Sequence, residues 1–363
     1  MNPKQYIEFI LNPLELLRTK KVLKVNPTAE PSRVEPEKSI ISVYDYDRDK
    51  LAMPVINKLE DTFAFLKSET VTWINIDGLR KDDVNKICDH FSIHPLIIED
   101  ILSLGQRPKT DEVNGIIFCI LNMLSFDEKT ASVETEQVSI ILGKDYVISF
   151  QEDEERDPFN VLREKLKMSN SKVRQNGADF LFYSLLDYIV DHYFLVMEKM
   201  GDKIELLEED IIKNSSNRSL IKINTLRKEM ILLKRSIAPV RELIGSILRS
   251  DSDLIEDRTE KYFKDVYDHI IQAYDLSENY RDMIMNLQDL YLSNVNLRMN
   301  EVMKVMAVVT CLLAPATVIG GIFGMNFDMI PMMHNKWGFF TSVGLMLFIP
   351  FVMIRFFKKR GWF

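Results

Sequence analysis

The chain has 363 residues and a formal net charge of −8, from 46 Lys and Arg against 54 Asp and Glu. Its mean hydropathy of −0.07 is typical of a soluble protein, and its length corresponds to about two or three domains. The acidic balance argues against a nucleic-acid partner, because phosphate recognition requires clustered Lys and Arg. The cysteines Cys88, Cys119 and Cys311 form neither a CxxC pair nor a zinc spacing, so no disulfide framework is expected.

Residues 1–39 are expected to form an N-terminal helix and a linker. Residues 4–18 have amphipathic periodicity interrupted near Pro13, and residues 26–38 contain three prolines and no periodicity. Glu8 and Glu15, together with the lack of an apolar core, argue against a signal peptide or a mitochondrial presequence. The large N-terminal region is therefore expected to stay in the cytosol.

Residues 40–155 are expected to form an α/β domain with a mixed sheet. Five apolar, β-branched runs predict strands. They are Ile40 to Tyr46, Val71 to Ile76, Gly115 to Leu124, Val138 to Leu142 and Tyr146 to Phe150. Two segments between them, Lys81 to Phe91 and Pro95 to Leu102, predict helices.

The chain from residue 156 onward shows helical periodicity and no strand signal. Residues 156–252 predict a helical hairpin, with arms over Asn176 to Lys213 and Ser219 to Ser250. Residues 253–304 predict a stalk helix that continues to about Gly320, with Pro315 as its only interior breaker. Such a helix would be roughly 100 Å long. A helix of that length with a polar stripe needs partners, so we expect an oligomer.

Two C-terminal segments are long enough and apolar enough to cross a membrane. There is no Asp, Glu, Lys or Arg in the 23 residues from Val305 to Phe327 or in the 18 residues from Trp337 to Ile354. Each run covers most or all of a hydrocarbon core of about 30 Å. We expect transmembrane helices over 305–325 and 337–355, an external loop over 326–336 and a basic cytosolic tail over 356–363. A soluble protein with two buried core helices is the alternative.

Flanking charge predicts the orientation of these two spans. The basic residues on the side of the termini are Arg298, Lys304, Arg355, Lys358, Lys359 and Arg360, whereas the loop between the spans carries only Lys336. Cytoplasmic segments carry an excess of Lys and Arg. Both termini are therefore expected in the cytoplasm.

One face of the first span carries small and neutral polar residues. At alternating steps of three and four it consists of Asn300, Met303, Ala307, Thr310, Ala314, Thr317, Gly321 and Gly324. Small residues also line ordinary helix contacts in membranes, so a packing surface and a pore fit the stripe equally well. Neutral oxygens suit a cation that keeps its water, and Mg²⁺ dehydrates reluctantly.

The end of the first span resembles a known family. Gly324-Met325-Asn326 precedes a short loop and a second span, in a chain with an α/β domain, a long stalk and a basic tail. This arrangement resembles the CorA family of magnesium channels over roughly residues 40–363. Similar stretches are Ile93-His94-Pro95-Leu96, Gln106-Arg107-Pro108-Lys109, Asp265-Val266-Tyr267-Asp268-His269 and Asn300-Glu301-Val302-Met303-Lys304.

The resemblance implies a funnel-shaped homopentamer in the cell (inner) membrane that admits Mg²⁺ down its electrochemical gradient. The first span would line the pore, and the second would face lipid. The implied pore residues are a mouth ring of Gly324, Met325 and Asn326, a polar ring of Thr317, a hydrophobic constriction of Met303 and Met306, and then Asn300 and Asp289 further along the stalk.

The resemblance also implies regulation by Mg²⁺. Asp100 of one protomer would face Asp265 of the next, with Glu99 and Asp187 at a nearby site. The residues themselves offer Asp265 and His269 at i, i+4 on one helix face. Without the resemblance, ordinary surface acids would be the favoured interpretation.

Two positions depart from the family pattern, and several alternatives stay open. Ala314 stands where a bulkier apolar residue is common, and Met332 stands where Glu is frequent, which leaves Asp328 as the only acid of the loop. A Co²⁺, Ni²⁺ or Zn²⁺ transporter of the same family is the first alternative, and a membrane-anchored sensor or scaffold is the second. No nucleotide-binding or catalytic motif is present, so neither a pump nor an enzyme is expected.

Overall fold

The computed structural model describes residues 35–36, 38–56, 58–67, 70–153, 158–214, 216–326, 330–332 and 335–362. The helix expected over residues 4–18 and the loop residue Asp328 lie outside these ranges. The chain divides into two compact units. One consists of Met1–Leu207 with Ile221–Met285, and the other of Glu208–Leu220 with Asn286–Phe363.

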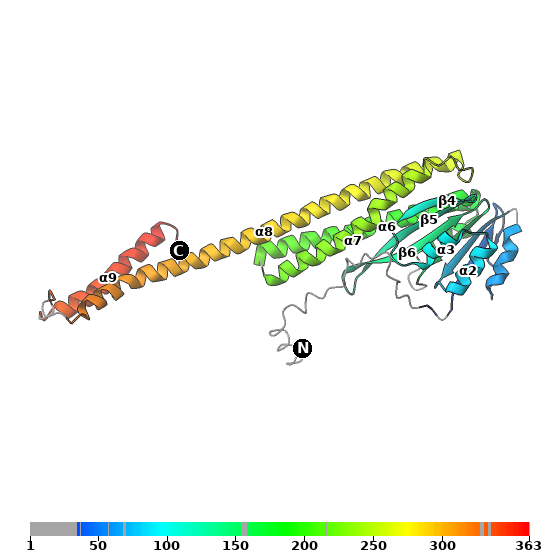
Figure 1. Ribbon diagram of the computed structural model, residues 1–363. Helices are drawn as coiled ribbons and strands as arrows, with labels where there is room; N and C mark the ends of the chain where they lie inside the picture. The colour runs from blue at the N-terminus through cyan, green and yellow to red at the C-terminus, as the bar shows by residue number, and fades with distance from the viewer. Residues whose placement is uncertain are drawn as a thin grey trace. The chain divides into compact units, whose positions relative to one another are not determined.

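A seven-stranded mixed sheet forms the centre of the first unit (Figure 1). Its strands are β1 (Ile40–Tyr46), β2 (Leu51–Ala52), β3 (Val71–Asp77), β4 (Lys109–Val113), β5 (Ile116–Asp127), β6 (Ser132–Leu142) and β7 (Tyr146–Gln151). They lie in the order β2-β1-β3-β7-β6-β5-β4, and β3 pairs with β7 in parallel. The five predicted strands are confirmed. The prediction missed β2, which has two residues, and the edge strand β4, whose sequence KTDEV contains no apolar run.

Helices cover both faces of this sheet, which explains why its central strands are almost continuously apolar. One face packs against η2 (Leu59–Lys67), α2 (Lys81–His90) and α3 (Pro95–Leu102). Ile74, Phe118 and Ile148 from the strands form one buried cluster with Ile87 and Ile97 from these helices.

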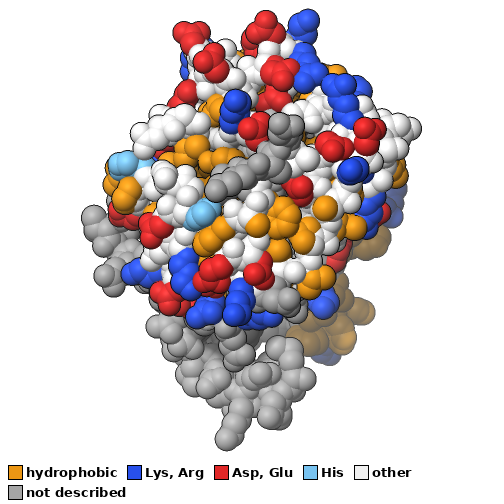
Figure 2. Space-filling model, turned by 90° about the vertical axis from the view of Figure 1, so that its right-hand side faces the viewer, with side chains coloured by type: hydrophobic (Ala, Val, Ile, Leu, Met, Phe, Trp, Pro, Cys, Tyr) orange, Lys and Arg blue, Asp and Glu red, His pale blue; other side chains and the backbone are white. Residues whose placement is uncertain are grey.

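On the side of the molecule that Figure 2 shows, acidic and basic side chains are interspersed rather than separated by sign.

The opposite face packs against α4 (Asn160–Lys167), α6 (Ala178–Asn214) and α7 (Asn217–Ile247). The Tyr193 hydroxyl on α6 donates to the Asn122 carbonyl at 2.8 Å, and the Asn122 amide donates to Ser236 Oγ on α7 at 3.3 Å. The helices α6 and α7 form the predicted antiparallel hairpin (Figure 1). The region before it contains two short helices, α4 and α5 (Lys172–Gln175), which the sequence pattern did not separate.

Three helices in the described part of the chain are long and apolar enough to span a membrane: α6, α8 (Asp257–Phe323) and α9 (Gly338–Lys359). The most apolar window of α6 is 67% buried within the protein, whereas the windows of α8 and α9 are 6% and 0% buried. The α6 helix is therefore a core element, and the two apolar segments predicted as spans lie in α8 and α9, where they are not buried by the rest of the chain. The α8 helix remains continuous through Pro315.

Candidate functional site

The stripe of small and neutral polar residues on α8 faces away from α9. All eight members of the stripe are exposed in the single chain. In contrast, Val308 is 3% exposed, and a Cβ on Gly320 would lie 3.8 Å from Met346 Cε of α9. Thr310 follows Val308 by two residues, which is roughly half a turn of the helix. A Cβ on Gly321 would meet open space. Packing between α8 and α9 therefore does not account for the stripe.

The hydroxyl groups of this stripe are held by the helix backbone. Thr310 Oγ1 donates to the Met306 carbonyl at 2.9 Å, and Thr317 Oγ1 donates to the Leu313 carbonyl at 3.1 Å. Each hydroxyl proton is thus satisfied within the helix, and each oxygen keeps lone pairs that can accept a further hydrogen bond. Water bound to a cation directs its hydrogens outward. The stripe therefore offers acceptors suited to a hydrated cation.

The chain leaves α8 through Gly324, whose N–H donates to the Gly320 carbonyl at 2.9 Å. A Cβ at position 324 would lie 3.1 Å from that same carbonyl oxygen. This contact is tighter than ordinary van der Waals contact, so glycine suits the close approach. Met325 and Asn326 follow and are both exposed. An exposed amide side chain thus follows two residues after Gly324, the last member of the stripe.

The other predicted pore residues are also exposed in the single chain. Met303 and Met306 are 54% and 64% exposed, and Asn300 and Asp289 are exposed as well. Further apolar side chains of this part of α8, such as Val305, Leu313 and Val318, are exposed too. An apolar surface of this extent requires a cover of lipid or protein.

A candidate metal centre lies between α6 and α8 in the first unit. Asp187 and Asp191 of α6 and His269 of α8 each offer a ligand atom, and these atoms all lie within 4.8 Å of one another. Two carboxylates and an imidazole at this spacing fit one divalent ion. Mg²⁺ prefers oxygen ligands alone, whereas the imidazole nitrogen favours Co²⁺, Ni²⁺ or Zn²⁺.

Asp187 has an unusual electrostatic environment. Burial raises its pKa to about 6, and the nearby Asp191 carboxylate adds to the rise. A hydrogen bond from Tyr183 and the neighbouring His269 oppose this shift, while Asp265 contributes a smaller repulsion. A carboxylate that is costly to ionise beside a second carboxylate is a typical feature of cation sites.

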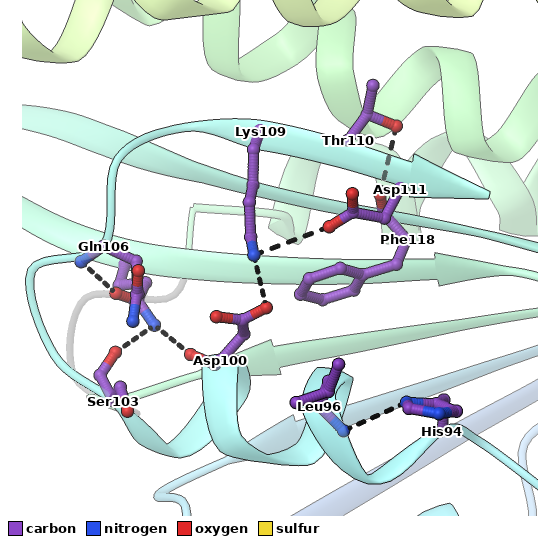
Figure 3. A network of polar contacts seen from close by, with 10 residues as sticks. His94, Leu96, Asp100, Ser103, Gln106, Lys109, Thr110, Asp111 and Phe118 are labelled. Atoms are coloured by element: carbon purple, nitrogen blue, oxygen red, sulfur yellow. Dashed lines mark hydrogen bonds and ion pairs between the residues drawn. The ribbon is translucent and has the colours of Figure 1, made fainter. Parts of the chain in front are cut away.

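Asp100 lies in a different polar network, which Figure 3 shows. Lys109 Nζ lies 2.5 Å from Asp100 Oδ2 and 3.5 Å from Asp111 Oδ2. Burial lowers the pKa of Lys109, but the contacts with Asp100 and Asp111 outweigh it and leave that pKa raised. The Asp100 carboxylate is thus balanced by a cation of its own chain.

The structure brings together some of the predicted regulatory residues and not others. Among the described residues, the one cluster of three or more possible ligands contains Asp187 and His269 but not Glu99, Asp100 or Asp265. The sequence prediction missed Asp191 and Lys109. The i, i+4 spacing of Asp187 and Asp191 was an available signal for the first of these.

Comparison with known proteins identifies related sequences along most of the chain. A family model described as CorA-like Mg²⁺ transporter protein matches residues 68–359. The chain is 38% identical over 323 residues to the cobalt/magnesium transport protein CorA of Thermotoga maritima, which covers 89% of this chain and 92% of that protein. It is 33% identical over 291 residues to the putative metal ion transporter YfjQ of Bacillus subtilis, covering 80% and 89% of the two chains.

Solved structures share the fold at lower sequence identity. The CorA magnesium transporter of Methanocaldococcus jannaschii matches with a TM-score of 0.74 and 22% identity, covering 89% of this chain and 99% of that one. The full-length CmaX protein matches with a TM-score of 0.68 and 17% identity, covering 90% and 100%. An α/β domain followed by long C-terminal helices is thus a fold with known examples.

Proposed function

The chain belongs to the CorA-like Mg²⁺ transporter family, and on that premise we propose that it is a channel through which hydrated Mg²⁺ enters the cell. Its relatives are named as transport proteins, among them a cobalt/magnesium transporter. We propose Co²⁺ as a second cargo on this basis. Ni²⁺ and Zn²⁺ are tested as further cargoes in the experiment below.

The observation that carries the proposal is the orientation of the α8 stripe. The stripe faces away from α9. The chain carries no charged side chain from Val305 to Asn326, the residue that follows the end of the stripe. We propose that five copies of α8 surround a pore with this stripe inward, while α9 faces lipid. Gly324, Met325 and Asn326 would form the mouth, and Asp328 would be the acid of the loop.

Along the proposed pore, Asn326, Thr317 and Thr310 would offer oxygens to the water shell of the ion. Ala314 would leave a wide segment, and Met303 and Met306 would form the constriction, followed by Asn300 and Asp289. Neutral acceptors hold a hydrated ion without removing its water, which suits Mg²⁺.

No energy source besides the membrane potential is needed for uptake. Moving two positive charges inward across 100 mV releases about 4.6 kcal/mol, which corresponds to more than three decades of concentration. We propose a location in the cell membrane with both termini in the cytoplasm. The excess of basic residues beside the termini over the single Lys336 of the loop supports this orientation.

We further propose that Mg²⁺ regulates the channel through the first unit. Asp100 and Asp265 of neighbouring protomers would share one ion, with Glu99 nearby. The cluster of Asp187, Asp191 and His269 would hold a second divalent ion, for which its imidazole favours Co²⁺ over Mg²⁺. A bound divalent ion supplies positive charge between carboxylates that otherwise repel by about 4 kcal/mol at 4 Å and an effective dielectric constant of about 20. Its loss would favour separation of the protomers.

The proposal is tested by measuring the flux of divalent cations into proteoliposomes under an imposed, inside-negative membrane potential. Mg²⁺, Co²⁺, Ni²⁺ and Zn²⁺ are compared for the wild-type chain and for Asn326→Ala. We expect Asn326→Ala to abolish flux while the oligomer still assembles, as measured by light scattering in detergent. Asn335→Ala, in the same loop, is the matched control and should conduct. Normal flux through Asn326→Ala would refute the assignment of the mouth.

A further inference from the structure

The proposed regulatory ligand Asp100 already has a cation beside it within its own chain. Lys109 Nζ lies 2.5 Å from Asp100 Oδ2, and the Asp100 side chain is only 16% exposed. A short ion pair with one partner largely removed from water is stronger than a typical surface pair. An ion that binds Asp100 must therefore act against this contact.

The backbone on both sides of this pair is fixed. The Gln137 amide donates to the carbonyls of Asp100 and Ser103 at 3.3 and 2.9 Å, and its oxygen accepts from the Gln106 N–H at 3.2 Å. These bonds tie the end of α3 and the following loop to β6. The backbone of Asp100 and of the loop before Lys109 is thus held in place, and β4, which carries Lys109 and Asp111, pairs with β5. The lysine ammonium moves on a flexible stem.

A second carboxylate is available to Lys109 without any backbone change. Asp111 lies two residues further along β4 and therefore on the same face of that strand. Its Oδ2 is 3.5 Å from Lys109 Nζ, and its side chain is 47% exposed. Figure 3 shows the ammonium directed between the two acids. A small rotation of the lysine side chain exchanges one partner for the other.

We propose that Lys109 is a tethered competitor of the divalent ion: it neutralises Asp100 when the regulatory site is empty and moves to Asp111 when an ion binds. This inference rests on the proposed function, in which Asp100 is a ligand. The ammonium and a divalent ion on one carboxylate repel each other, so each ion bound displaces one lysine contact. Lys109 thereby sets the cytosolic ion concentration at which the site fills.

Competition by a tethered group lowers the apparent affinity of a site by a constant factor. Lys109→Met keeps the aliphatic stem and removes the charge. We expect it to lower the midpoint ion concentration roughly five- to tenfold, the factor that about 1 to 1.4 kcal/mol represents. Asp111→Asn removes the alternative partner and should raise the midpoint about two- to threefold, because displaced Lys109 loses its second carboxylate.

General electrostatics would also produce changes of these signs, so the double variant is decisive. If Asp111 acts through Lys109, then Asp111→Asn has no effect when Lys109→Met is already present. If the two charges act independently on the ion, their effects add. Arg107→Gln is the matched control, since it removes a positive charge two residues away that pairs with Glu242 instead, at 3.0 Å.

The measurement is protection of the full-length, detergent-solubilised oligomer against limited proteolysis, titrated with Mg²⁺ alone and with Co²⁺ alone. The inference is supported by three results together. The midpoint ion concentration is lower in Lys109→Met, Asp111→Asn causes no further change in the double variant, and Arg107→Gln leaves the midpoint unchanged. An unchanged midpoint in Lys109→Met, or additive effects, would overturn it. Asp100→Asn distinguishes failure of the regulatory site from failure of the competition by Lys109. If Asp100→Asn leaves the midpoint unchanged, Asp100 is not a ligand and the proposed regulatory site itself is refuted.

Discussion

Asp187 provides a test in which removing a negative charge stabilises the protein. Its pKa is raised from 3.8 to about 6, chiefly by burial and then by Asp191. Such a rise corresponds to about 3 kcal/mol for a fully buried group, and the partial exposure of Asp187 reduces this to about 1–2 kcal/mol. Asp187→Asn keeps the shape and an oxygen that accepts from Tyr183. We expect the ion-free variant to be more stable than wild type by this amount at pH 8.

The pH dependence follows from the two protonation states. Below about pH 3 the Asp187 carboxyl is protonated in the folded and the unfolded chain, so the substitution has no electrostatic advantage. As the pH rises from about 4 to about 6, the unfolded chain loses this proton while folded Asp187 keeps it, so wild type loses stability and the advantage of the variant grows. The difference should therefore be near zero at about pH 3, increase between about pH 4 and 6, and be constant above about pH 7.

The assay is thermal unfolding of the full-length protein in detergent with EDTA at several pH values, and then with added Co²⁺. At pH 8 without metal, Asp187→Asn should unfold roughly 2–4 °C above wild type. Co²⁺ should stabilise wild type by mass action and the variant far less. Asp202→Asn, exposed on the same helix, is the control and should behave as wild type. A lower unfolding temperature for Asp187→Asn at pH 8, or equal stabilisation by Co²⁺, would refute the reasoning.

Three further predictions concern the pore, a buried ion pair and the metal cluster. Gly321→Leu should abolish flux in liposomes without preventing assembly, because its side chain would enter the proposed pore. Lys203→Met should reduce the stability of the protein at pH 8 by about 3 kcal/mol, because it leaves the buried Glu229 carboxylate without its partner at 2.6 Å. That loss should shrink as the pH falls, since burial raises the pKa of the Glu229 carboxyl and a protonated carboxyl needs no cation beside it. His269→Gln should weaken stabilisation by Co²⁺ roughly tenfold and by Mg²⁺ less, as titrated thermal unfolding will measure.

Each of these predictions has its own control. Gly344→Leu on α9 also enters open space in the single chain, and it should conduct because α9 is proposed to face lipid. Replacing Lys203 and Glu229 together by Met and Leu should restore most of the stability lost in the single variant. Equal weakening of Co²⁺ and Mg²⁺ by His269→Gln would contradict a role for the imidazole nitrogen.

The fold could be predicted wherever burial is one-sided or complete along a whole element. The helices α2 and α3 and the five apolar strands were found because local hydrophobic patterns match their packing. The edge strand β4 was missed because its hydrogen-bonded partner β5, rather than its own KTDEV sequence, makes it a strand. The apolar helix α6 is a second element whose environment cannot be read from its own sequence. Its hydropathy is compatible with a membrane span, and only its packing in the first unit identifies it as a core helix.

The candidate site divides in the same way. The positions of the stripe on α8 follow from helical periodicity, and the Gly-Met-Asn residues were recognised by resemblance. Asp191 and Lys109 were missed because their importance depends on partners from other elements: His269 is 78 positions from Asp191, and Asp100 belongs to α3 whereas Lys109 belongs to β4. Charge on a surface residue says little until its neighbours are known.

Hydrophobic periodicity and segment length are local properties of the chain, and they were enough to predict an α/β region, a very long helix and two apolar C-terminal segments. Only the packed structure shows which way the stripe on α8 faces, which carboxylates lie beside an imidazole, and which lysine neutralises Asp100. Those facts depend on distances between residues remote in the sequence, and such distances are set only when the helices and strands pack together.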